Sequence, residues 1–187
     1  MLVTLPTSAS YVPNMTIIED IYKRCPRRDP TEATEDLKAA SEDYPKGKAL
    51  SKELQLDRKR LKDDSYLSPR KLFYGFGVDI QDFIDYHQRY NLPRPPPEDD
   101  RSLLWLYMMD QVLEDLKKTC HFYRFKRELA ISVEHRYILA IYDSYTFDHG
   151  EMDNDTEQRI YGELRERMDV CKNQEPRWFR PFPDIYD

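Results

Sequence analysis

The apolar side chains of this chain are concentrated in residues 101–147, where they recur with two different periods. Over residues 102–118 they are spaced three and four positions apart, which predicts a helix with one buried face. Over residues 129–133 and 137–142 apolar β-branched and aromatic side chains recur at alternate positions, which predicts two strands joined by a turn. The same positions also fit a second helix, and the turn lacks the Asn-Gly or Asp-Gly pair that would favour a hairpin. We take the strands as the prediction, with residues 121–125 as a candidate third strand.

Helix-start signals predict two more helices, one on each side of this stretch. Asp79 is a good N-cap with Asp82 three positions later, so we expect a helix over residues 79–91. A capping box precedes a last amphipathic helix, which we expect over residues 156–171. The predicted fold class is therefore α+β, with these three main helices packed on a small antiparallel sheet built from residues 121–147.

The N-terminal third of the chain is rich in charge and poor in apolar side chains. Capping signals predict short helices over residues 17–24 and 30–40, and three spaced leucines predict another over 48–62. Short helices of this kind are marginal in water, so the arm is expected either to be flexible or to wrap on the core or on a partner. The predicted organisation is a charged helical arm at 1–68, a globular α+β domain at 69–175, and a tail rich in aromatic residues and proline at 176–187.

Charge is distributed unevenly along the 187 residues, which have a net charge of −6. Residues 1–72 carry a net charge of +2 and residues 73–187 a net charge of −8. An acidic domain does not favour binding to the phosphates of a nucleic acid or to an anionic membrane surface, so neither partner is expected. The longest apolar run, residues 103–109, is shorter than the ~18 residues of a membrane span. Three cysteines without a pairing motif and the absence of a secretory signal predict an intracellular protein, with the cytoplasm preferred and the nucleus as the alternative.

No local motif in the chain indicates catalysis, a metal or a cofactor. Gly75 and Gly77 precede a predicted helix, but Ile80 stands where the nucleotide-binding fingerprint needs its third glycine, so we interpret them as a structural turn. The acidic turn at 148–155 fails the calcium-loop pattern, because Asp153 stands where glycine is required. None of the four histidines has zinc-site spacing. The sequence therefore favours a non-enzymatic protein without a cofactor or metal.

Function is expected to reside in contact with a protein partner or with a second copy of the chain. Fourteen tyrosines and an aromatic content of 13% are suited to a recognition surface. The C-terminal tail must be extended because of its prolines, and its large aromatic side chains need cover from water. That cover is either a latch on the chain's own surface or the groove of a partner. The candidate partner-binding residues are Trp178, Phe179, Phe182 and Tyr186.

An alternative hypothesis is a small enzyme or ligand-binding protein. Its pocket would lie between a helix and the sheet, and would use His135, Asp143 and Tyr145 as its polar side chains. A binding module should present exposed apolar area, whereas an enzyme should direct at least two titratable side chains at one point.

The chain from residue 74 to residue 180 resembles small uncharacterised fungal proteins. The shared features are the opening Gly75-Phe76-Gly77-Val78, an apolar strand in the middle, and the closing Glu175-Pro176 followed by Trp178 and Phe179. The resemblance implies a fungal source and no activity, and it does not extend to the arm before residue 70.

Overall fold

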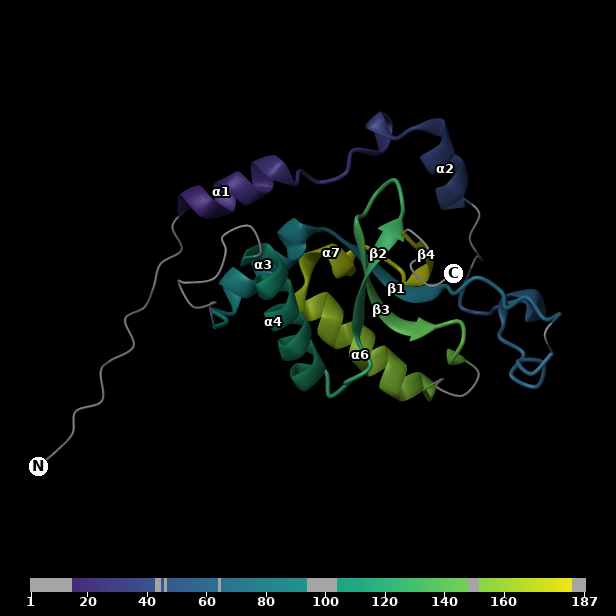
Figure 1. Ribbon diagram of the computed structural model, residues 1–187. Coiled ribbons are helices and arrows are strands. Elements are labelled where there is room, and N and C mark those ends of the chain that lie inside the picture. Colours follow the sequence, from purple (N-terminus) through teal and green to yellow (C-terminus); the bar gives the residue numbers. More distant parts are fainter. Residues whose placement is uncertain are drawn as a thin grey trace, which may run out of the picture.

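The computed structural model describes residues 15–42, 45, 47–63, 65–93, 104–147 and 152–182 (Figure 1). Part of the acidic turn, residues 148–151, and the candidate partner-binding residue Tyr186 lie outside these ranges. The arm contains α1 (Met15–Arg24), η1 (Pro30–Glu32), α2 (Glu35–Glu42) and η2 (Lys52–Leu54). The rest contains β1 (Phe73–Val78), α3 (Ile80–Arg89), α4 (Leu104–Thr119), β2 (Lys126–Ile131), β3 (Tyr137–Asp143), α6 (Asn154–Arg167), α7 (Asp169–Lys172) and β4 (Arg177–Pro181).

The four strands form a closed barrel in the order β1-β3-β2-β4, in which all the paired strands are antiparallel. β4 closes it by pairing with β1, where Tyr74 faces Trp178, and with β2, where Ala130 faces Pro181. The α+β class is confirmed, and so is the second central strand, which is β3. The first central strand is present as β2, but it covers residues 126–131 rather than 129–133 and buries Ala130 rather than Leu129. The predicted limits of the sheet are wrong, because β1 and β4 lie outside residues 121–147 and residues 121–125 form a turn.

The inside of the four-stranded barrel is filled by a small cluster of side chains and by close approach of the strands. Side chains in β1 and β3 alternate between an inner cluster and a larger outer core, as the two faces of a pleated strand require. The inner cluster consists of Phe73, Ala130, Ile138, Ala140 and Phe179. β1 adds Gly75 and Gly77, and a Cβ atom on Gly75 would lie 2.1 Å from the backbone oxygen of Leu139. A Cβ atom on Gly77 would instead meet the imidazole ring of His135. The predicted turn at residues 75–77 is therefore wrong: these glycines lie inside a strand, where a backbone and a side chain approach them closely.

The outer face of the barrel packs against α3, α4, α6 and α7, which Figure 1 shows gathered on one side of the strands. The predicted helix at 79–91 is confirmed as α3, and its capping box is present, with the Asp79 N–H donating to Asp82 Oδ2 at 2.7 Å. The predicted helix at 156–171 is divided at Met168, whose extended backbone places its side chain in the core between α6 and α7. Within the described residues, four helices therefore cover the barrel, rather than the three that were predicted.

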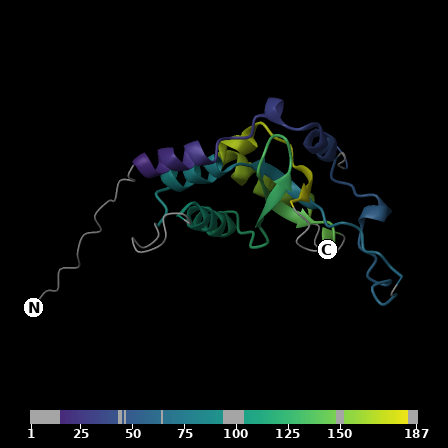
Figure 2. The same ribbon diagram turned by 45° about the horizontal axis from the view of Figure 1, so that its top comes forward.

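The arm lies across the domain, with α1 beside α3 in both views (Figures 1 and 2). Ile21 of α1 and Leu50 are buried in the main core, and the Tyr22 hydroxyl donates to Asp85 Oδ1 at 2.6 Å. The predicted helix at 48–62 is wrong, because that segment contains only η2 and turns. Its backbone makes tertiary contacts instead: the carbonyl of Lys48 accepts a hydrogen bond from Trp178 Nε1 at 3.0 Å. Among the described helices, none combines the length and the apolar character needed to span a bilayer.

Candidate functional site

The structure separates His135 from the other two residues of the predicted pocket. His135 lies in the turn before β3, beside Gly77, whereas Asp143 ends β3. Seven residues of strand at about 3.3 Å each place these ends about 20 Å apart. Tyr145 follows Asp143 and donates its hydroxyl to the Pro69 carbonyl at 2.5 Å. His135 is therefore not part of one site with Asp143 and Tyr145.

Asp143 is held by two lysines. Its Oδ2 atom accepts a hydrogen bond from Lys126 Nζ at 3.1 Å and lies 3.6 Å from Lys71 Nζ. Burial opposes ionisation, but the Lys126 hydrogen bond and the positive charge of Lys71 outweigh it, so the pKa of Asp143 lies below its usual value. An anchored, ionised carboxylate of this kind suits a structural role at the end of a strand. Among the described residues, no group of three His, Cys, Asp or Glu side chains is placed to hold a metal ion.

The aromatic tail divides into a buried and an exposed part. Trp178 and Phe179 are both 0% exposed, Trp178 in the main core and Phe179 inside the barrel. Phe182, just beyond β4, is 52% exposed, and its N–H donates to the Leu129 carbonyl at 2.9 Å. Completely buried side chains offer no surface area to a partner. The positions of Trp178 and Phe179 therefore fit a latch on the chain's own surface rather than contact with the groove of a partner. Phe182 remains the exposed aromatic side chain of the described tail.

An unpredicted site surrounds the amino group of Lys48. Its Nζ atom lies 2.5 Å from Glu157 Oε2, 5.2 Å from the ring centroid of Tyr142 and 5.7 Å from that of Phe147. We call Tyr142, Phe147 and Glu157 the lysine cage. The Lys48 side chain is 26% exposed, so part of the occupant of the cage remains in contact with solvent. Two aromatic faces and a carboxylate are the groups that recognise an organic cation.

Two more aromatic side chains hold the cage rings in place. Trp178 packs against Phe147 at 5.5 Å and 79°, and against Tyr74 at 5.2 Å between ring centroids. Tyr142 meets Phe147 edge to face at 5.4 Å and 88°. Such tilted and edge-to-face contacts are favourable and define ring orientation. The buried tail tryptophan therefore supports the cage and, through its Nε1 atom, also fixes the backbone of its occupant.

The carboxylate of the cage is buried and oriented. Glu157 is 5% exposed on the first turn of α6, and the Tyr161 hydroxyl, one turn later, donates to its Oε1 atom. Burial and the hydrogen bond to Glu157 raise the pKa of Tyr161 well above its usual value, so the hydroxyl remains a donor at neutral pH. This bond leaves Oε2 directed at the ammonium group. A negative charge withdrawn from water in this way requires a cation beside it.

Sequence reasoning missed this site because its members are dispersed over the chain. Lys48 belonged to an apparently solvated charged segment, and Glu157 to a helix-capping sequence. Tyr142, Phe147 and Trp178 all resemble ordinary core residues. The large number of tyrosines was the one sequence feature that pointed to a recognition surface, and it does not indicate which residues form the site.

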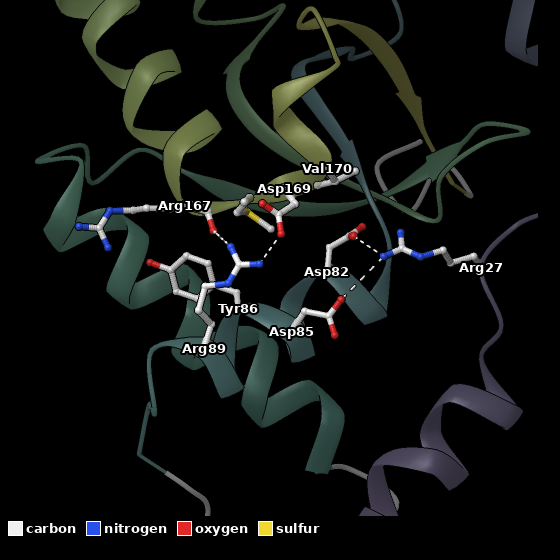
Figure 3. Close-up of a pocket in the computed structure, with 9 residues that line it drawn as sticks. Arg27, Asp82, Asp85, Tyr86, Arg89, Arg167, Asp169 and Val170 are labelled. Carbon is white, nitrogen blue, oxygen red and sulfur yellow. Dashed lines mark hydrogen bonds and ion pairs between the residues drawn. The ribbon is translucent and has the colours of Figure 1, made fainter.

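A second polar feature is a small hollow of about 160 Å³ between α3, the start of α7 and the arm (Figure 3). Arg27 pairs with Asp82 at 2.6 Å, and Arg89 pairs with Asp169 and donates to the Arg167 carbonyl at 3.2 Å. Figure 3 shows the Arg167 guanidinium group directed away from the hollow. The charged groups bind one another across the hollow, so we interpret it as a clamp that joins the arm and α7 to α3.

Comparison of the chain with known protein families, with curated proteins and with solved structures finds no match in any of the three.

Proposed function

We propose that this protein is a non-enzymatic intracellular interaction module that captures a lysine side chain of a protein partner in the lysine cage. The observation that carries this proposal is the placement of the Lys48 ammonium group against two aromatic faces and the buried Glu157 carboxylate. In the free protein Lys48 occupies the cage itself. A partner lysine takes its place when the segment around Lys48 leaves.

The lysine cage requires a cation, but this cation does not have to be the ammonium group of Lys48. A cation–π contact contributes about 0.5–1 kcal/mol when exposed and about 2 kcal/mol when desolvated. Removing the cation would leave the charge of Glu157 buried without it, which is costly. Any ammonium group that replaces Lys48 restores both interactions, so exchange of one lysine for another is nearly balanced.

The segment that carries Lys48 is suited to leave. Described residues of α2 bury no side chain, and η2 buries none either. Among the described residues between them, Leu50 is buried, at 8% exposure. The described anchors of the segment include the Lys48 ion pair, the Lys48 carbonyl bond to Trp178 and the side chain of Leu50, and segments with little buried apolar area open at low cost.

A peptide added in trans tests the proposal. Lys48→Ala should vacate the cage, and a synthetic peptide of residues 45–52 should then bind the variant, as measured by calorimetry and by the fluorescence change of Trp178. The same peptide should bind the native protein at least tenfold more weakly, because Lys48 competes. Lys52→Ala removes an exposed lysine of the same segment and serves as the matched control, which should behave as the native protein does.

A peptide with norleucine in place of Lys48 distinguishes recognition of the ammonium group from non-specific hydrophobic binding, because norleucine keeps the aliphatic stem without the charge. Equal binding of the norleucine peptide, or no gain from Lys48→Ala, would contradict the proposal. If the alanine variant does not fold, Lys48→Gln replaces it, because glutamine keeps much of the stem and removes the charge. Sedimentation at two protein concentrations shows in addition whether the partner is a second copy of this chain.

A further inference from the structure

The distances inside the lysine cage specify which lysine it accepts, an inference that rests on the proposed function. A methyl carbon packs on an aromatic face at about 3.5–4.0 Å. A C–N single bond adds about 1.5 Å, so a methylated nitrogen lies about 5.0–5.5 Å from the ring. The Lys48 nitrogen lies 5.2 Å from the Tyr142 centroid and 5.7 Å from the Phe147 centroid. Each ring therefore stands about one methyl group away from the nitrogen.

The side of the Lys48 nitrogen that faces Glu157 requires an N–H donor rather than a methyl group. Glu157 Oε2 lies 2.5 Å from Lys48 Nζ, a distance that needs an N–H donor and leaves no space for a methyl group. Tyr161 holds the other carboxylate oxygen, and burial restricts the movement of Glu157 away from the nitrogen. A trimethylated lysine would lose this hydrogen bond and would press a methyl group on the carboxylate. An acetylated lysine would lose the positive charge.

From this geometry we infer that the lysine cage selects dimethyllysine on a partner protein. Its two methyl groups face Tyr142 and Phe147, and its remaining N–H donates to Glu157. Unmodified Lys48 makes the carboxylate bond but carries no methyl group that could pack on the two rings. A dimethyllysine segment therefore displaces the arm from the cage more effectively than an unmodified one.

Synthetic peptides that differ only in methylation test the inference. The Lys48→Ala protein is titrated with the peptide of residues 45–52 carrying an unmodified, monomethyl, dimethyl or trimethyl lysine at position 48. Dimethyllysine should bind about tenfold more tightly than unmodified lysine and several-fold more tightly than trimethyllysine, with monomethyllysine between unmodified and dimethyllysine. If the alanine variant does not fold, Lys48→Gln is titrated in its place. Equal affinities for all four peptides would overturn the inference and leave the proposed function standing, whereas no binding of any peptide would overturn both.

Two further variants assign the selectivity to named groups. Glu157→Gln keeps the shape of the side chain and removes its charge. It should therefore weaken binding of the dimethyllysine peptide and bring the affinity for that peptide within twofold of the affinity for the trimethyllysine peptide. Tyr142→Leu keeps an apolar side chain without a π face and should reduce the preference for dimethyl over unmodified lysine. Glu163→Gln changes a partly exposed carboxylate on the same helix and should leave all four affinities unchanged. Retention of the full methyl preference in both cage variants would overturn the assignment.

Discussion

Replacement of Trp178 by alanine tests whether the tail is the latch that closes the barrel and supports the cage. Trp178 is 0% exposed and packs against Tyr74 and Phe147. Removing a buried tryptophan costs about 3–5 kcal/mol in other proteins. Loss of its Nε1 hydrogen bond leaves the Lys48 carbonyl without this donor and adds about 1 kcal/mol. For a chain of this size each kcal/mol lowers Tm by about 2–4 °C, so the expected decrease is about 15 °C, within a range of about 8–24 °C.

The assay is thermal unfolding followed by circular dichroism, with urea unfolding as a second measurement. Phe182→Ala is the matched control, because it removes an aromatic side chain of the same tail that is 52% exposed. Exposed substitutions usually change stability by about 0.5 kcal/mol or less, so its Tm should shift by about 2 °C at most. Trp178→Phe keeps a buried ring and should fall between the two.

A Trp178→Ala protein that melts within about 2 °C of the native protein would refute the latch, because so small a change is incompatible with a filled core position. An equal effect of Phe182→Ala would also refute it, since burial would then not be the source of the stabilisation.

Four other substitutions test separate parts of the fold. Gly75→Ala should lower the free energy of unfolding by about 3 kcal/mol, because its Cβ atom would lie 2.1 Å from a backbone oxygen. Gly162→Ala should instead stabilise α6 by about 0.5–1 kcal/mol, because its Cβ atom would meet nothing within 4 Å. Urea unfolding measures both changes. Asp79→Ala should cost about 1 kcal/mol as a lost cap, and an unchanged urea midpoint would contradict that role. Because the pKa of Asp143 is lowered in the folded protein, its stabilising effect should be complete above the unfolded-state pKa of about 4 and be lost as the pH falls through the folded-state pKa. The stability difference between the native protein and Asp143→Asn should therefore be largest at neutral pH and disappear in acid, and a difference that grows in acid would reverse the sign of the argument.

The sequence by itself determined the elements whose pattern is local. The capping box at Asp79 and Asp82 involves residues three positions apart, so it could be recognised without any tertiary information, and α3 begins there. The two central strands followed from alternation within a few residues, and α4 from helical spacing. In each case the residues that decide the backbone conformation are neighbours in the chain.

Tertiary structure alone decided the barrel and the cage. The two glycines in β1 indicate a turn when only their neighbours are considered, and they belong to a strand because they pair with β3, with Leu139 close to Gly75 and the His135 ring close to Gly77. The tail becomes β4 because its pairing with β1 and β2 supplies hydrogen bonds and buries Trp178. The lysine cage then combines side chains of β3, α6 and the turn after β3 around a lysine of the arm. No local pattern specifies such an arrangement, because the groups become neighbours only when the barrel closes and the arm docks on it.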